Sequence, residues 1–208
     1  MPNELWRQLF IKAVQMLEAA GIPRNEWTFG GGTALALFLQ HRESMDIDIF
    51  LHDAQLLSLL TPRVNKNLSK VTDYTESSNF LKLKYPEGEI DFILAPFLTS
   101  NPWTLMDLEG KAVQVETPEE IVIKKLFYRA ETLRVRDVID TAAVYAARKE
   151  QFLGEAAVLT SRLEALKRRW ERLKPVFPVE VQALHLNEDL VKTAPALFES
   201  FLENCSSR

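Results

Sequence analysis

The chain has 208 residues, enough to bury a core in one domain or in two small ones. Its formal net charge of -4 excludes a protein that coats itself with nucleic acid through overall positive charge, although a local basic patch remains compatible with it. One cysteine, no secretory signal pattern and no apolar run of roughly 18 residues lead us to expect a cytoplasmic protein without disulfides or a membrane span.

Residues 3–20 carry apolar side chains at helical spacing, and Gly21 follows where a helix C-cap belongs. A short strand at 27–29 ends in three glycines, and a buried helix is expected from Thr33. The following elements are then expected in order: a strand at 46–51, a helix at 54–60, a helix that opens at 61–62, a strand at 71–75, a hairpin of 80–85 and 89–94, and a strand at 112–115.

The character of the chain changes at 117–120, where a Thr, a Pro and two acids form a typical helix start. From there the pattern is almost entirely helical. Three prolines are expected to separate these helices: Pro175, Pro178 and Pro195. The sequence therefore predicts an α+β fold, with a small mixed β-sheet and flanking helices in residues 1–116 and a helical domain in 117–208.

Two carboxylates, Asp46 and Asp48, alternate with isoleucines on the strand predicted at 46–51. Residues two apart on a strand point to the same face, about 7 Å apart, so the acids are expected to project together. Such a pair can bridge two Mg²⁺ ions roughly 4 Å apart in phosphoryl or nucleotidyl transfer. The alternative is a strand with one solvated face, and an isolated Asp-x-Asp favours that alternative, because short motifs often match by chance.

The glycines that precede the acids add a second feature. Gly31, Gly32 and Thr33 follow a short strand and open a helix, so backbone N–H groups in this turn can cradle a triphosphate. A plain tight turn is the alternative. Asp91 adds a third carboxylate, on the second arm of the predicted hairpin, where it can hold a metal ion or act as a base.

A longer pattern supports these features. Gly31-Gly32-Thr33-Ala34-Leu35, then His41-Arg42-Glu43-Ser44-Met45-Asp46-Ile47-Asp48-Ile49-Phe50, resembles the AbiEii/AbiGii-type toxin family of the DNA-polymerase-β-like nucleotidyltransferase superfamily. Downstream, Glu89-Ile90-Asp91-Phe92 is similar to the family strand that bears the third carboxylate. Lys125-Leu126, Arg129, and Arg136-Asp137 with Asp140 resemble the family's helical segment. The resemblance extends over about residues 29–145.

The resemblance implies a polymerase-β-like core in which Asp46, Asp48 and Asp91 hold Mg²⁺, and in which Lys125 and Asp137 line the nucleotide pocket. Judged by spacing alone, Lys125, Arg129 and Arg136 favour a solvated helix face. Together with the upstream motif, cationic groups that face the triphosphate become the better interpretation. Arg42 and Ser44 lie on the loop before the predicted metal strand, where they can contact phosphate or brace the loop.

The resemblance also implies a function: transfer of a nucleotide from an NTP donor to an acceptor hydroxyl, with a tRNA 3′ end as the acceptor, toxicity, and a separately encoded antitoxin as partner. Two alternatives stay open. One is modification of an aminoglycoside-like antibiotic by the same chemistry, and the other is a catalytically silent nucleotide-binding or regulatory module.

A basic stretch lies at 162–174, with leucines and a tryptophan at helical spacing. The apolar residues indicate packing against other helices. The basic face can be an ordinary solvated surface or a contact for an RNA backbone, and the sequence favours the solvated surface.

Overall fold

The computed structural model describes residues 5–64, 71–184, 186 and 188–206. The chain divides into two compact units. The first comprises Met1–Ala34, Ser44–Phe97 and Trp103–Glu116, and the second comprises Leu35–Glu43, Leu98–Pro102 and Thr117–Arg208. One division thus follows residue 116, but two short segments from the N-terminal part of the chain group with the helical unit.

The first unit is built on strands, and its described part contains two helices and the first turn of a third. Its elements are α1 (Leu5–Ala19), a 3₁₀ turn (Arg24–Glu26), β1 (Trp27–Gly30), the start of α2 (Gly31–Leu39), β2 (Ile47–Leu51), α3 (Ala54–Leu60), β3 (Asp73–Ser77), β4 (Phe80–Tyr85), β5 (Gly88–Leu94), β6 (Trp103–Leu108) and β7 (Lys111–Glu116).

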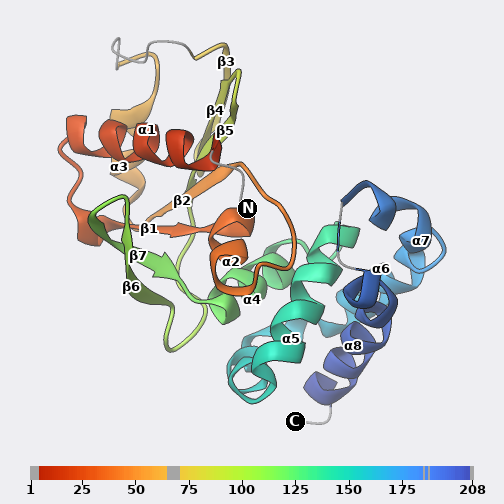
Figure 1. Cartoon of the computed structure of the whole chain (residues 1–208). Coiled ribbons are helices and arrows are strands. Elements are labelled where there is room, and N and C mark those ends of the chain that lie inside the picture. The colour runs from red at the N-terminus through yellow and green to blue at the C-terminus, as the bar shows by residue number, and fades with distance from the viewer. Residues whose placement is uncertain (1–4, 65–70, 185, 187, 207–208) are drawn as a thin grey trace. The chain divides into compact units, whose positions relative to one another are not determined.

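In the described residues, seven strands form one mixed sheet, in the order β3-β4-β5-β2-β1-β7-β6 (Figure 1). The pairs β2 with β5 and β1 with β7 are parallel, and the other neighbouring pairs are antiparallel. The predicted α+β class is confirmed.

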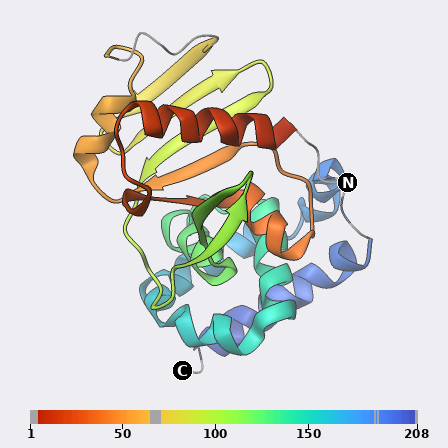
Figure 2. The same cartoon turned by 60° about the vertical axis from the view of Figure 1, so that its left-hand side comes forward.

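One face of the sheet is apolar and supports the core of this unit. Ile47 and Ile49 of β2 and Phe92 of β5 are fully buried, and α1 runs across the strands to contribute Leu9 and Phe10 (Figure 2). Because side chains alternate along a strand, the residues between these apolar ones face the other way. The burial of one face therefore decides which side chains are available for chemistry on the opposite face.

Three elements differ from the sequence-based expectations. The β6 strand was not predicted, because its outer residues are exposed and its pairing with β7 gives no strong apolar alternation. The strand expected at 71–75 is shifted to Asp73–Ser77 by its register with β4. Where a helix was expected to open at Thr61-Pro62, residues 61–64 form a bend and a turn, and residues 65–70 lie outside the described part of the chain.

The second unit is helical. It contains the rest of α2, then α4 (Pro118–Tyr128), α5 (Val135–Glu155), a 3₁₀ segment (Ala156–Arg162), α6 (Leu163–Leu173), α7 (Phe177–Glu180), a 3₁₀ segment (Val181–Leu184) and α8 (Glu188–Ser206). Aromatic contacts join these helices: Phe152 of α5 stacks on Phe201 of α8 at 4.6 Å, and Trp170 of α6 meets Phe198 at 5.3 Å.

Pro195 does not separate two helices as expected, because it lies inside α8. A proline inside a helix removes one hydrogen bond and costs about 3 kcal/mol. Ala194, Phe198 and Phe201 of the same helix are buried, so packing rather than local propensity maintains the helix. Of the helices in the described parts of the chain, none combines the length and apolar character that a bilayer crossing requires.

Candidate active site

Two parallel strands bring two carboxylates side by side. Asp48 of β2 lies in register with Asp91 of β5, and the flanking pair Ile47 and Ile90 is fully buried on the core face. Neighbouring strands are about 4.8 Å apart, so the two acids share one face of the sheet at close range. The structure thus brings together two of the three carboxylates predicted from the sequence.

Asp46, the third of these acids, lies just before β2 rather than on it. Its carboxylate accepts a hydrogen bond from the backbone N–H of Glu89 at 3.2 Å, which fixes it to the start of β5. Its carbonyl oxygen accepts a bond from the hydroxyl of Thr33 at 2.6 Å. Thr33 is thus a brace for the entry to β2, and its predicted role in nucleotide binding stays a prediction.

The glycine turn lies directly against Asp48. Gly31 has a φ of +74°, and a Cβ atom on it would come within 1.8 Å of Asp48 Oδ2. Gly30, the last residue of β1, would place a Cβ atom 2.4 Å from Oε2 of the buried Glu116. Gly32 is buried in the first turn of α2. The N-terminal end of α2, whose first N–H groups have no partner within the helix, therefore starts beside a candidate metal ligand.

Gly31→Ala is expected to lower activity about 10²-fold, because the new methyl group must displace the Asp48 carboxylate and a shift near 1 Å has an effect of that size. The positive φ adds a strain of about 1–2 kcal/mol. Gly21→Ala is a matched control, because Gly21 has a φ of +72° and nothing within 4 Å of the added atom. Steady-state rates and urea unfolding of both variants test this: equal rates would show that Gly31 is not needed to position Asp48.

A lysine that the sequence analysis did not single out lies among the acids. Lys82 of β4 is in register with Asp91. Its Nζ lies 2.9 Å from Asp91 Oδ2 and 2.5 Å from Glu89 Oε2. The alternation of 80–85 predicts that Lys82 is on the polar face, but only the register of the hairpin shows that it meets Asp91. Glu89 is thus a further carboxylate on this face.

Burial and charge set the protonation of Asp91. Burial raises the pKa of Asp91 to about 6, the hydrogen bond from Lys82 opposes this rise, and the negative charge of Asp48 adds to it. Burial lowers the pKa of Lys82, but its hydrogen bonds to Glu89 and Asp91 outweigh burial, so the pKa is raised. Asp91 Oδ1 is buried and has no hydrogen-bond partner in the described structure.

These acids fit a hard cation by their chemistry. Mg²⁺ prefers oxygen ligands and is usually held by one or two carboxylates, with substrate phosphates and water completing its shell. Asp48 and Asp91 share a face, and the Oδ1 atom of Asp91 is available for such a bond. No three or more His, Cys, Asp or Glu side chains in the described residues are grouped so as to hold a metal ion by themselves. The carboxylates therefore suit a Mg²⁺ ion that is bound together with the phosphates of a nucleotide.

Lys82→Gln is expected to raise the affinity for Mn²⁺ about tenfold, because it removes a positive charge that competes for Asp91 and repels the ion. Lys84→Gln is the matched control: Lys84 lies two residues along the same strand and pairs instead with Asp73, at 2.9 Å. Titration with Mn²⁺, followed by electron paramagnetic resonance, measures both. Equal or weaker binding by Lys82→Gln would show that the lysine does not compete with the cation.

In the second unit, two predicted nucleotide-binding residues converge on Asp140 of α5. Lys125 Nζ lies 2.5 Å from Asp140 Oδ2, and Arg42 donates from Nε to Oδ1 at 2.6 Å and from Nη2 to Oδ2 at 3.0 Å. His41 Nε2 lies 2.7 Å from the same Oδ1. Asp140 is fully buried, so this cluster is an internal charge network, and the predicted contacts of Lys125 and Arg42 with phosphate stay predictions.

Asp137 is placed differently. It is fully buried at the start of α5, where its carboxylate accepts a bond from the N–H of Arg134 at 3.0 Å and pairs with Arg129 at 3.3 Å. These contacts make Asp137 a capping residue of α5. Its predicted place in a nucleotide pocket stays a prediction. Ser44 is half-buried on the segment before β2, and its predicted contact with phosphate also stays a prediction.

The comparisons with known proteins concern the family and the fold of the chain. A family model described as "Nucleotidyl transferase AbiEii toxin, Type IV TA system" matches residues 15–207. A search of curated proteins finds no match. Several solved structures share the fold, and three of them follow. A putative nucleotidyltransferase from H. pylori is 19% identical, with a TM-score of 0.50 and coverage of 95% of this chain and 96% of that one.

The antibiotic-resistance factor ANT(2″)-Ia is 16% identical, with a TM-score of 0.52 and coverage of 79% of this chain and 98% of that one. An antigenic nucleotidyltransferase-like protein from Paracoccidioides brasiliensis is also 16% identical, with a TM-score of 0.51 and coverage of 86% and 94%. At these identities the likeness shows the fold, and it extends over most of both chains in each case.

Proposed function

We propose that this chain, which belongs to the AbiEii family of nucleotidyltransferase toxins, moves a nucleotide from an NTP to an acceptor hydroxyl at a site formed by Asp46, Asp48 and Asp91. The family and the fold make it a nucleotidyltransferase. The observation that carries the site is the register pairing of Asp48 with Asp91, beside the close approach of Gly31.

Each residue then has a chemical role that its surroundings support. Two Mg²⁺ ions bound by the three acids would neutralise the triphosphate, polarise the α-phosphorus and lower the pKa of the acceptor hydroxyl. The α2 helix starts at Gly31 beside Asp48, and its first N–H groups, at Gly31 and Gly32, would bind phosphate oxygens. Asp91, which lies in register with Asp48, would either hold the metal that activates the attacking hydroxyl or accept the proton of that hydroxyl.

The acceptor is proposed from the family. The 3′ end of a tRNA is our first candidate, and the family's description as a toxin of a toxin–antitoxin system supports a separately encoded antitoxin as partner. A cytoplasmic location follows from an RNA acceptor. The fold shared with the antibiotic-resistance factor ANT(2″)-Ia favours aminoglycosides as the second acceptor class to test.

The test offers each acceptor class in turn. The protein is incubated with Mg²⁺ and each of the four α-labelled NTPs, together with total tRNA, cellular protein or aminoglycosides. Label on tRNA that disappears with Asp46→Ala supports the proposal. Label on a drug supports the second acceptor class. Nucleotide binding without transfer to any of the three would instead indicate a silent binding module.

A further inference from the structure

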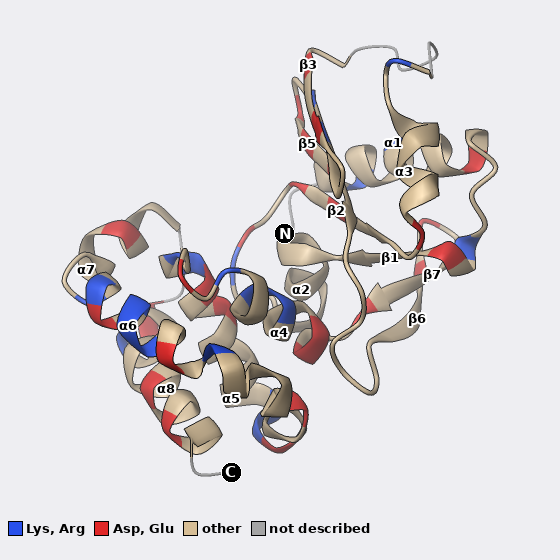
Figure 3. Cartoon of the chain, turned by 180° about the vertical axis from the view of Figure 1, so that it is seen from behind, with Lys and Arg blue, Asp and Glu red and all other residues tan. Residues whose placement is uncertain are grey.

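The polar face of α6 concentrates positive charge in a chain that is acidic overall. Residues 162–174 contain six basic and two acidic residues, whereas the whole chain has a net charge of -4. The other face, with Leu166 and Trp170, is buried against neighbouring helices of this unit. Figure 3 shows the basic residues along the labelled α6 helix. Packing therefore accounts for the apolar residues but leaves the basic face unexplained.

Some of these cations are already neutralised. Lys167 lies 3.7 Å from Glu164, and Lys174 lies 2.7 Å from Glu171 and 2.9 Å from Glu199. Pairs of this kind are ordinary for a solvated helix. They do not extend to the arginines in the middle of the helix.

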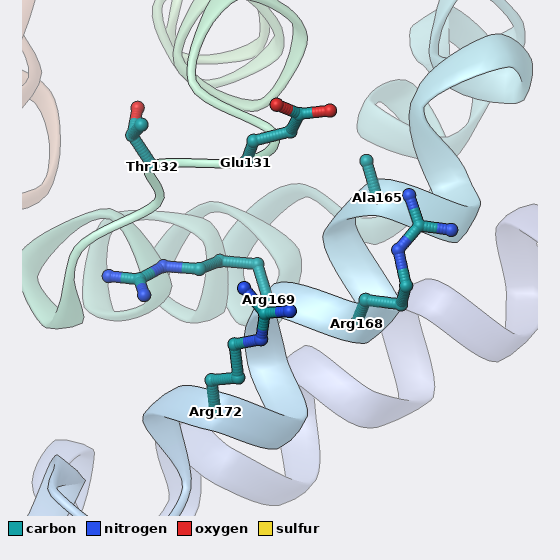
Figure 4. A pocket seen from close by; sticks show the side chains of 6 residues that line it. All are labelled: Glu131, Thr132, Ala165, Arg168, Arg169 and Arg172. Atoms are coloured by element: carbon teal, nitrogen blue, oxygen red, sulfur yellow. The ribbon is translucent and has the colours of Figure 1, made fainter.

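Three arginines of α6, Arg168, Arg169 and Arg172, line a pocket. Its volume is about 370 Å³, and its lining residues are Glu131, Thr132, Ala165, Arg168, Arg169 and Arg172 (Figure 4). Arg169 is oriented by a 2.9 Å hydrogen bond from its Nε to the carbonyl oxygen of Leu133. Arg168 and Arg172 are exposed and have no carboxylate within ion-pair distance among the described residues.

The chemistry of the pocket selects an anion. Three guanidinium groups repel one another unless an anion lies between them, and Glu131 is the single acid in the lining. Guanidinium groups match phosphate oxygens with paired N–H donors, and the hydroxyl of Thr132 adds a neutral donor. Arg168 and Arg172 are one helical turn apart, about 6 Å along the axis, so they offer a row of charge rather than one point.

Aromatic side chains close to the pocket in sequence favour RNA over a free phosphate. Tyr128, three residues before Glu131, exposes 53% of its surface and packs edge-on against Phe127. The guanidinium of Arg162 lies over the Phe127 ring at 4.5 Å. Exposed aromatic rings among arginines are typical of surfaces that bind single-stranded RNA, because they stack on bases while the cations hold the backbone.

We propose that the pocket formed by Arg168, Arg169 and Arg172 binds the phosphodiester backbone of an RNA acceptor. This inference rests on the proposed function, since it supplies a binding site for the acceptor class proposed there. Arg168 and Arg172 supply the charge, and Arg169, which is already fixed by Leu133, sets the direction of the third guanidinium.

The test compares two double variants of the same helix. The double variant Arg168→Gln with Arg172→Gln removes the two cations that have no ion-pair partner among the described residues. The double variant Lys167→Gln with Lys174→Gln removes two cations that are paired with glutamates. Both variants change the net charge by the same amount. Binding of labelled, unfractionated tRNA is measured by fluorescence anisotropy over a series of salt concentrations. The arginine variant is expected to lose about tenfold in affinity, and its log–log salt slope is expected to fall by about 1.4, since each lost contact contributes about 0.7. The lysine variant should keep the wild-type affinity for tRNA and the wild-type salt slope.

The possible failures are distinguishable. Equal loss in the two double variants, or no loss in the arginine variant, would overturn the RNA site. Binding of Mg²⁺-ATP by the arginine variant should equal that of the wild type, which separates the pocket from nucleotide binding. If the protein transfers label to a small molecule and does not bind tRNA, the RNA site is wrong, but the proposed nucleotidyl transfer is still supported.

Discussion

Asp48→Asn is expected to lower the rate of nucleotide transfer about 10³-fold while the protein stays folded. The side chain keeps its shape, so the register of β2 with β5 should be preserved. The substitution removes one negative charge beside Asp91 and the start of α2. That charge is needed to hold the metal that neutralises the triphosphate. Initial rates with saturating NTP and Mg²⁺ measure the effect, and circular dichroism confirms the fold.

Asp73→Asn provides the matched control, because Asp73 lies on β3 of the same sheet. It is exposed, and its pairing with Lys84 at 2.9 Å is a surface contact that solvent screens. This control should keep the wild-type rate. A rate for Asp48→Asn equal to that of Asp73→Asn would contradict the assignment of Asp48 as a ligand of the catalytic metal.

Asp140→Asn is expected to lower the free energy of unfolding by about 3–5 kcal/mol, because it leaves Lys125 and Arg42 without their shared counter-charge in a buried site. Glu171→Gln is the control in the same unit: it removes an exposed carboxylate and should change stability by less than about 1 kcal/mol. Urea unfolding at pH 7 compares the three proteins. Equal stability of all three would show that the cluster is not a closed charge network.

The same cluster predicts a pH dependence. Burial alone would raise the pKa of Asp140, but Lys125, Arg42 and the hydrogen bond from His41 hold it well below its usual value. A carboxylate with a lowered folded pKa stabilises the protein above its unfolded pKa, near 3.9, and loses that contribution as pH falls below it. Wild-type stability should therefore fall from pH 5 to pH 3 more steeply than that of Asp140→Asn. Parallel curves would contradict the network.

Much of the fold follows from local patterns. Apolar alternation predicts β2, β4 and β5, and the Thr117-Pro118 start predicts α4, because burial of one face repeats with a fixed period. Pro195 shows the limit of this reasoning. Its local preference ends a helix, but packing around Ala194 and Phe198 overrides it. Tertiary contacts of this kind leave no signal in a short window of sequence.

The candidate site shows the same division. Asp46, Asp48 and Asp91 are predictable, because a strand period and a family pattern both point to them. Lys82 was missed, because its contact with Asp91 depends on the register between β4 and β5, which a single sequence does not encode locally.

The acids of α5 raise a related difficulty. Asp137 and Asp140 are three residues apart, and spacing alone does not decide which of them meets Lys125. The fold resolves this, because Asp140 carries the ion pair with Lys125 while Asp137 caps the helix. Asp140, rather than Asp137, is therefore the acid of this segment that lies beside Lys125.

The position of the transferred label tests the central claim most directly. The protein is incubated with Mg²⁺, total tRNA and either α-labelled or γ-labelled NTP in parallel. Nucleotidyl transfer predicts that label from the α-phosphorus becomes covalently attached to RNA, while label from the γ-phosphorus is released in pyrophosphate. Both should be about 10³-fold slower with Asp48→Asn. Attachment of the γ-label to the acceptor, or release of free phosphate in place of pyrophosphate, would contradict the account.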